Sequence, residues 1–267
     1  MSWTTRPASE VAGNIAAQIK GKGPALVLVH GVGLCAQAWE AAGDHLAQHM
    51  EVHALDMPGH GRSPLDGAAS LGAFSDRIGR YVESLGQPVR IAGHSMGAMI
   101  ALQLAARASL NLTHVAALNA IFRRTRKAAD AVQARAAALS SDRVSDPEPT
   151  LTRWFGPHPQ GALASASAAC RDWLTQANPS GYKAAYTIFA QHDGPEDKSL
   201  HEMACPAMFL TGARDPNSTP EMSRAMGDLC PNGEVVVVKE AAHMLPLTHP
   251  RETAQHLETF FMRTGAR

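Results

Sequence analysis

The chain has 267 residues, of which 45% are hydrophobic, and its 24 Lys and Arg balance its 24 Asp and Glu. A neutral chain with a pI of about 7.2 lacks the broad positive field that binds nucleic acid or an anionic membrane, so neither is expected as a partner. The first residues hold no apolar core of signal-peptide length, and no run approaches the roughly 20 apolar residues of a spanning helix. We therefore expect a cytoplasmic location.

Strands and helices alternate in the first part of the chain. Short apolar runs closed by Gly-rich turns predict buried strands, and the stretches between them have helical periodicity. The expected strands are 25–29, 51–55, 89–92 and 115–118, and the expected helices are 36–50, 71–85 and 98–108. This alternation predicts an α/β fold with a mostly parallel central sheet and helices on both faces.

The alternation stops between residues 122 and 200, where Pro-rich breaks separate helical stretches and no strand is expected. It resumes with strands at 207–210 and 235–238 and helices at 220–229 and 250–262. We therefore predict one α/β core, residues 1–121 and 201–267, with an inserted helical cap, residues 122–200.

A serine lies between two glycines directly after the expected strand 89–92, in the stretch 93–97 (Gly-His-Ser-Met-Gly). A very tight strand-to-helix turn crowds the residues two before and two after its centre, and glycine at both removes the clashing side chains. Such a turn raises the Ser95 hydroxyl above the sheet at a helix N-terminus, where backbone N–H groups favour negative charge. Ser95 is the predicted nucleophile, and His94 is expected to point away from it.

A serine needs a base, and the base needs an acid that orients it. His243 follows the last expected strand, at the edge of a parallel sheet where catalytic groups collect. Asp215 follows the strand 207–210 and is the predicted acid. At the alternative acid position, the end of the preceding strand, Asn119 cannot carry the charge.

No metal or cofactor is expected. His45 and His49 have a spacing compatible with metal ligands, but no third ligand lies near them in the sequence. His201 begins an H-E-x-x-H-like stretch whose second histidine is replaced by Cys205. The four cysteines form no CxxC pair, so we expect reduced, structural thiols.

Over nearly its whole length the chain resembles the α/β-hydrolase superfamily, whose order of catalytic residues is Ser, Asp, His. The matching segments are His30-Gly31-Val32-Gly33, Asp56-Met57-Pro58-Gly59-His60-Gly61-Arg62-Ser63, the Ser95 turn, Gly212-Ala213-Arg214-Asp215 and Ala242-His243. The resemblance implies an oxyanion hole formed by the backbone N–H groups of Val32 and Met96.

Within the superfamily the chain is similar to the small esterase and lactonase group, which includes 3-oxoadipate enol-lactone hydrolases and pimeloyl-carrier-protein methyl ester esterases. Short matches at 152–155 (Thr-Arg-Trp-Phe) and 178–182 (Asn-Pro-Ser-Gly-Tyr) extend the similarity to the enol-lactonase cap. The resemblance implies a serine hydrolase that cleaves a small-molecule ester or lactone through an acyl-enzyme intermediate.

Aromatic and basic residues of the expected cap are candidates for binding the substrate. Arginine binds a carboxylate with two parallel hydrogen bonds, and aromatic rings commonly line ligand sites. Arg123, Arg124, Arg126 and Lys127 are expected to open a cap helix. The candidates are Trp154, Phe155, Trp173, Tyr182 and Phe189 for an apolar lining, and Arg123, Arg124 and Arg153 for a substrate carboxylate. For each of them, packing within the cap or a solvated helix face is the competing interpretation.

Several functions remain open at this point. The same triad serves C–C bond hydrolases of ring-fission diketones and cofactor-free perhydrolases or haloperoxidases, and the fold also serves as a ligand-binding receptor with an unused triad. The sequence does not decide the substrate, nor whether the chain forms a homo-oligomer.

Overall fold

The computed structural model describes residues 1–67, 69–107 and 109–263. These residues form an eight-stranded sheet in the order β1-β2-β4-β3-β5-β6-β7-β8. The strands are β1 (Thr4–Arg6), β2 (Ala17–Lys20), β3 (Ala25–Val29), β4 (Glu51–Leu55), β5 (Val89–His94), β6 (Leu112–Leu118), β7 (Ala207–Gly212) and β8 (Gly233–Val238). From β4 to β8 all neighbours pair in parallel, and β2 pairs antiparallel with both β1 and β4. The predicted fold class is confirmed.

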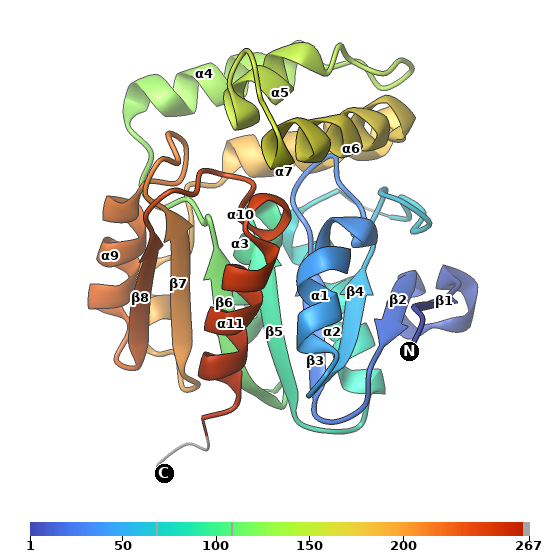
Figure 1. Cartoon of the computed structure of the whole chain (residues 1–267), viewed down its shortest axis with the longest axis vertical. Helices are drawn as coiled ribbons and strands as arrows, with labels where there is room; N and C mark the ends of the chain where they lie inside the picture. The colour runs from blue at the N-terminus through green and yellow to red at the C-terminus, as the bar shows by residue number, and fades with distance from the viewer. Residues whose placement is uncertain (68, 108, 264–267) are drawn as a thin grey trace.

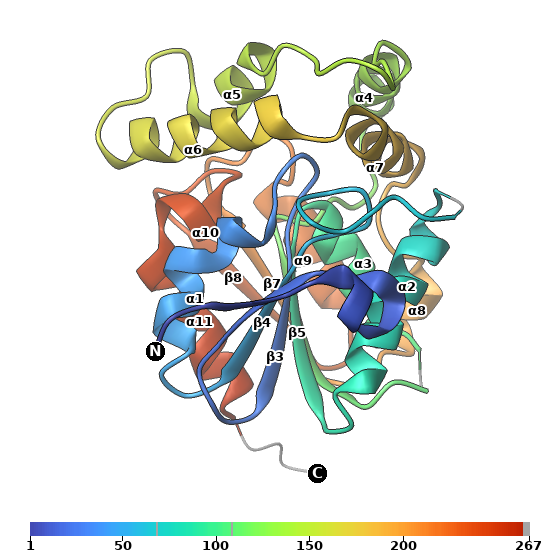
Figure 2. The same cartoon turned by 90° about the vertical axis from the view of Figure 1, so that its right-hand side faces the viewer.

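Helices cover both faces of the sheet, with α1 and α11 on one and α2, α3 and α9 on the other (Figures 1 and 2). The helices of the core are α1 (Glu40–Leu46), α2 (Leu71–Ser84), α3 (Met96–Ala105), α9 (Pro220–Leu229), α10 (Leu245–Thr248) and α11 (Pro250–Phe261). Short 3₁₀ turns lie at η1 (Ala8–Glu10), η2 (Ala12–Asn14) and η3 (Ala36–Trp39).

The strand β3 shows why its apolar run predicts a buried parallel strand. All five of its side chains are buried. Val27 and Val29 pack in the cluster that contains α2 and α3, whereas Leu26 and Leu28 pack in the cluster that contains α1 and α11. Because successive side chains of a strand point to opposite faces, a strand covered on both faces needs apolar residues throughout.

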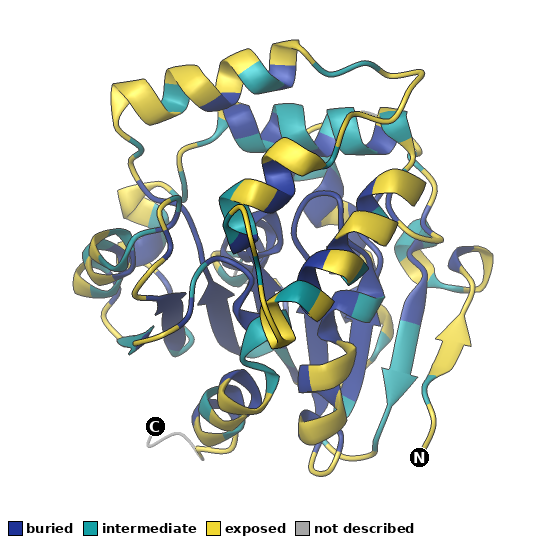
Figure 3. Cartoon of the chain, turned by 45° about the horizontal axis from the view of Figure 1, so that its top comes forward, coloured by how far each residue is buried: buried dark blue, intermediate teal, exposed yellow. Residues whose placement is uncertain are grey.

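Between β6 and β7 the chain forms α4 (Arg126–Ala137), α5 (Glu148–Phe155), α6 (Ala162–Gln176), α7 (Pro179–Gln191) and α8 (Asp197–His201). The first four, which we call the cap helices, lie above the carboxyl edge of the parallel strands (Figures 1 and 2). Much of their outward surface is exposed, while the parallel strands β3 to β7 below them are mostly buried (Figure 3). Within the described residues, no helix combines the length and the apolar character needed to cross a membrane.

Three details differ from the sequence prediction. The antiparallel strands β1 and β2 were not expected, because β1 is only three residues long and fully exposed and so lacks a buried apolar run. The expected helix 36–50 consists of η3 and α1 and ends already at Leu46, because the chain turns over 47–50 to enter β4. Arg123 and Arg124 were expected to open a cap helix, but they precede it, because α4 starts only at Arg126.

Candidate active site

The Ser95 turn joins β5 directly to α3. Ser95 has φ +56° and ψ −116°, a strained backbone conformation for a residue with a side chain. A Cβ on Gly93 would lie 2.0 Å from the carbonyl oxygen of Gly97, and one on Gly97 would lie 2.2 Å from that of Val29. The turn therefore requires glycine at both positions, which is the physical basis of the G-x-S-x-G spacing.

The surroundings of Ser95 suit an anion. Met96 is the first residue of α3, and the first amides of a helix have no partner within the helix. The loop after β3 packs against the turn, where a Cβ on Gly31 would lie 3.2 Å from that of Ser95. Val32, in the same loop, lines the pocket together with Ser95. The two predicted oxyanion donors thus come from two segments that meet at the serine.

His243 and Asp215 form a buried hydrogen-bonded pair. The Nδ1 of His243 lies 2.7 Å from the Oδ2 of Asp215. Burial alone would raise the pKa of Asp215, but attraction to His243 and donation from the backbone N–H groups of Asn217 and Ser218 hold that pKa below its usual value. Asp215 is therefore an ionised acceptor that holds the Nδ1 proton of His243 in the hydrogen bond between the two side chains.

Ser95 and His243 line the same pocket. Among the described residues, no hydrogen bond joins the side chains of Ser95 and His243. Catalytic hydrogen bonds often tighten only when a substrate is bound. The structure thus brings together at one pocket the three side chains that the sequence predicts as nucleophile, acid and base.

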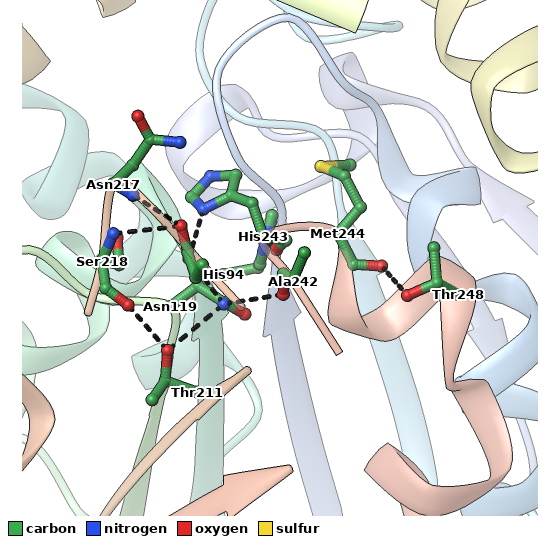
Figure 4. A network of polar contacts seen from close by, with 10 residues as sticks. His94, Asn119, Thr211, Asn217, Ser218, Ala242, His243, Met244 and Thr248 are labelled. Carbon is green, nitrogen blue, oxygen red and sulfur yellow. Dashed lines mark hydrogen bonds and ion pairs between the residues drawn. The ribbon is translucent and has the colours of Figure 1, made fainter. Parts of the chain in front are cut away.

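The loop that carries His243 is held by side chains from other strand ends (Figure 4). His94, the neighbour of Ser95, donates from Nε2 to the carbonyl oxygen of His243 at 2.7 Å. Asn119, after β6, donates from Nδ2 to Asp215 Oδ2 at 2.8 Å and to the carbonyl oxygen of Ala242 at 3.2 Å. In the sequence Asn119 stands out only as a residue that cannot be the acid, and these contacts were not predicted.

A cavity of about 360 Å³ opens between the sheet edge and the cap helices. This volume suits a small molecule. The ring of Trp154 stacks on that of His243, with ring centroids 6.2 Å apart and an angle of 26° between the planes, so this cap residue covers His243. The other cap side chains that line the cavity are Thr125, Ala128, Ala131, Val132, Tyr182, Tyr186 and Phe189, with the three arginines described next.

Arg124, Arg135 and Arg153 all line this cavity, and its described lining contains no Asp or Glu. Arg124 is neutralised from outside the cavity, since its Nη1 lies 2.7 Å from Asp193 Oδ1 and its side chain is only 5% exposed. Arg135 donates to the hydroxyl of Tyr186, and Arg153 donates to uncharged oxygens within α5. The cavity therefore carries a net positive charge that suits an anionic ligand.

The candidate binding residues divide into two groups. Trp154, Tyr182, Phe189, Arg124 and Arg153 line the cavity.

Phe155, Trp173 and Arg123 lie outside its lining. Phe155 and Trp173 pack in the apolar cluster that joins the cap helices to the core, which is a structural position. Arg123 pairs with Asp197 and has a side chain that is 59% exposed. Arg135 and Tyr186 were not predicted, because nothing in the sequence says which face of α4 or α7 meets the core.

Two further histidines support the loops around the site. His60 accepts the backbone N–H of Gly33 at 3.1 Å, and His30 accepts that of Met57 at 3.0 Å. Burial lowers the pKa of His30 to about 4 and that of His60 to about 3, so both are neutral acceptors. They hold the loop that bears the predicted oxyanion donor Val32.

Among the described residues, no three His, Cys, Asp or Glu side chains are grouped so that they could hold a metal ion. The cysteines are free thiols. Burial raises the pKa of Cys35 to about 12 and that of Cys205 to about 11, which keeps both thiols protonated.

Comparisons with known proteins agree with this geometry. A model of the alpha/beta hydrolase family matches residues 26–256. The (E)-2-((N-methylformamido)methylene)succinate hydrolase of Acinetobacter baylyi is 38% identical over 247 residues, covering 92% of this chain and 93% of that protein. A pimeloyl-[acyl-carrier protein] methyl ester esterase of Chromobacterium violaceum is 27% identical over 257 residues, covering 92% and 99%. The enol-lactonase from Burkholderia xenovorans superposes with a TM-score of 0.81 at 19% identity, covering 93% and 96%. The chain belongs to the alpha/beta hydrolase family, as its resemblance predicted, and it is a hydrolase.

Proposed function

We propose that this protein is a serine hydrolase that cleaves an acyl bond in a small molecule carrying one or two carboxylates. The observation that carries the proposal is the lining of the cavity, which contains Ser95, His243 and three arginines and, among the described residues, no Asp or Glu. Asp215 pairs with His243 from outside this lining, and Asp193 pairs with Arg124, so the charges of Arg135 and Arg153 remain unpaired in the described part of the chain. A neutral substrate would gain nothing from that charge, whereas a dianion would be attracted and oriented by it.

The proposed reaction uses the residues in succession. His243 Nε2 takes the proton of Ser95 as the hydroxyl oxygen attacks the carbonyl carbon, and the amides of Val32 and Met96 donate to the oxyanion. The bond to the leaving oxygen or nitrogen breaks as His243 returns the proton to it. Water, deprotonated by His243, then attacks the acyl-enzyme and releases the acid.

Two kinds of scissile bond fit this mechanism. The Acinetobacter baylyi relative is named for a succinate that carries an N-methylformamido-methylene group, a dianion with an acyl–nitrogen bond. The positive cavity favours a substrate of that kind, so an acylaminomethylene succinate is our first candidate. A carboxylic ester or lactone, as the sequence resemblance implies, is the second and is supported by the similarity to the Chromobacterium violaceum esterase.

The test compares turnover of the N-methylformamido-methylene succinate, p-nitrophenyl hemisuccinate and p-nitrophenyl butyrate. We expect Ser95→Ala to abolish turnover of all three and labelling by a fluorophosphonate probe. Full turnover by that variant would refute the serine mechanism.

The arginines are tested separately, with Arg135→Met and Arg153→Met. Losing a hydrogen bond to a charged group costs about 1.5–3 kcal/mol, so kcat/KM should fall about tenfold to a hundredfold for the anionic substrates and little for the butyrate. Arg126→Met is the matched control, because Arg126 lies on the same helix as Arg135 with a side chain that is 91% exposed. Equal losses on the neutral and anionic esters would refute recognition of a carboxylate.

A further inference from the structure

Asn119 occupies a buried position at the end of β6 that its backbone alone does not explain. It is 0% exposed and has φ +49°, a left-handed conformation that asparagine tolerates better than most residues. Its N–H donates to the carbonyl oxygen of Leu210 at 2.8 Å and continues the pairing of β6 with β7. A glycine would meet these backbone requirements equally well, so the side chain needs a separate explanation.

The amide nitrogen of Asn119 faces three oxygen atoms. Nδ2 lies 2.8 Å from Asp215 Oδ2, 3.2 Å from the carbonyl oxygen of Ala242 and 3.4 Å from Thr211 Oγ1. Thr211 already donates its own proton to the carbonyl oxygen of Ser218 and therefore presents a lone pair. The orientation of the amide is thus fixed, because the opposite one would place its oxygen against acceptors.

The carbonyl oxygens of three successive residues in the base loop are held from three different strand ends. The backbone N–H of Arg214, after β7, donates to Ala241 at 2.9 Å. Asn119, after β6, donates to Ala242, and His94, at the end of β5, donates to His243 (Figure 4). Of these three donors, Asn119 alone also contacts the carboxylate that accepts from His243.

We propose that Asn119 is a positioning residue of the catalytic machinery, whose single amide group fixes the Asp215 carboxylate and the backbone of the His243 loop relative to each other. This inference rests on the proposed function, in which His243 is the base. A shift of either partner changes the direction in which His243 Nε2 faces the nucleophile, and small misplacements of a catalytic group are costly. The donated hydrogen bond also spreads the negative charge of the carboxylate, which tunes how strongly it stabilises the imidazolium.

A glycine variant separates the amide from the backbone. Asn119→Gly keeps the left-handed conformation and removes only the side chain, so a residue needed merely for the turn would leave activity unchanged. We expect kcat to fall about tenfold to a hundredfold, the loss of a hydrogen bond to a charged group. KM should stay within about twofold, because Asn119 does not line the cavity and the substrate contacts remain.

The ¹H NMR resonance of the His243 Nδ1 proton gives a readout that does not depend on turnover, because this proton lies in the 2.7 Å hydrogen bond to Asp215. Asn119→Gly should move this resonance downfield, because the carboxylate loses a competing donor and accepts more strongly from His243.

The control is Asn14→Gly. Asn14 has φ +54° and makes its side-chain contact with Asp66, outside the cavity lining. Its loss should change neither kcat nor the resonance of the His243 Nδ1 proton. Near-UV circular dichroism verifies that each variant is folded, and Asn119→Ala, which also removes the amide, serves if Asn119→Gly is not.

Wild-type kcat together with an unchanged His243 Nδ1 proton resonance in Asn119→Gly would overturn the positioning role. If wild-type protein is not labelled by the fluorophosphonate at Ser95, the proposed function fails instead. The proton resonance would still report whether Asn119 controls the Asp215–His243 pair.

Discussion

Replacement of Asp215 by asparagine tests the arrangement of the site most directly. The carboxylate of Asp215 accepts four hydrogen bonds. Oδ1 receives the backbone N–H groups of Asn217 at 2.8 Å and Ser218 at 3.1 Å. Oδ2 receives Nδ1 of His243 at 2.7 Å and Nδ2 of Asn119 at 2.8 Å. An asparagine has one accepting oxygen, so one pair of donors must face an NH₂ group.

The geometry indicates which pair loses its acceptor in Asp215→Asn. The two backbone donors cannot rotate away, so the oxygen of the new amide would turn to them and its NH₂ to His243. The imidazole would then accept on Nδ1 and carry its proton on Nε2, which cannot take the proton of Ser95. The lost ion pair alone is worth about 4 kcal/mol at an effective dielectric constant of about 20. Because the same change in another Ser-His-Asp triad lowers kcat about 10⁴-fold, we expect a loss of about 10³- to 10⁴-fold in kcat with little change in KM.

The assay is the initial rate of p-nitrophenyl hemisuccinate hydrolysis, together with the rate of fluorophosphonate labelling. Asp228→Asn is the matched control, because Asp228 is an exposed acid on α9 outside the cavity lining, and it should behave as wild type. Retention of more than about a tenth of wild-type kcat by Asp215→Asn would show that Asp215 is not the orienting acid.

The remaining predictions concern stability. Burial lowers the pKa of His30 to about 4 and those of His60 and His94 to about 3. Below about pH 6.5 the unfolded chain therefore binds protons that the folded chain does not, and the free energy of unfolding should fall toward pH 4 by about 1.4 kcal/mol per pH unit for each histidine. Urea unfolding at several pH values measures this, and a constant free energy over that window would contradict it. Gly97→Ala should destabilise the fold or prevent soluble expression, because its Cβ would lie 2.2 Å from a backbone carbonyl oxygen of β3. Gly72 lies on helix α2, and the nearest atom to an added Cβ there is the hydroxyl oxygen of the N-cap residue Ser70, at 3.8 Å. Gly72→Ala should therefore retain or gain Tm, and equal Tm values for the two variants would contradict the steric argument.

Local patterns in the sequence predicted the core of the sheet and the residues at its carboxyl edge. An apolar run such as 25–29 predicts its own burial, because a parallel strand between two helical layers has no polar face. The glycines around Ser95 also predict their turn. A Cβ on Gly93 would clash with Gly97, and a Cβ on Gly97 would clash with the adjoining strand β3. Asp215 and His243 follow from their places after strands, because the carboxyl ends of parallel strands meet at one edge.

The tertiary structure alone decided which side chains face the substrate. Arg123 and Arg124 are neighbours in the chain, yet one is an exposed partner of Asp197 and the other lines the cavity. Arg135 and Arg153 reach the same cavity from different helices, and no local spacing relates them. Similarly, the sequence showed that Asn119 cannot be the acid, whereas its amide contacts became visible only with the loops after β6, β7 and β8 in place. Buried strands and tight turns leave local patterns in the sequence, even where the close contact is with a distant strand, as at Gly97. The packing of a helix over a sheet edge is set by the whole fold and leaves no such local pattern.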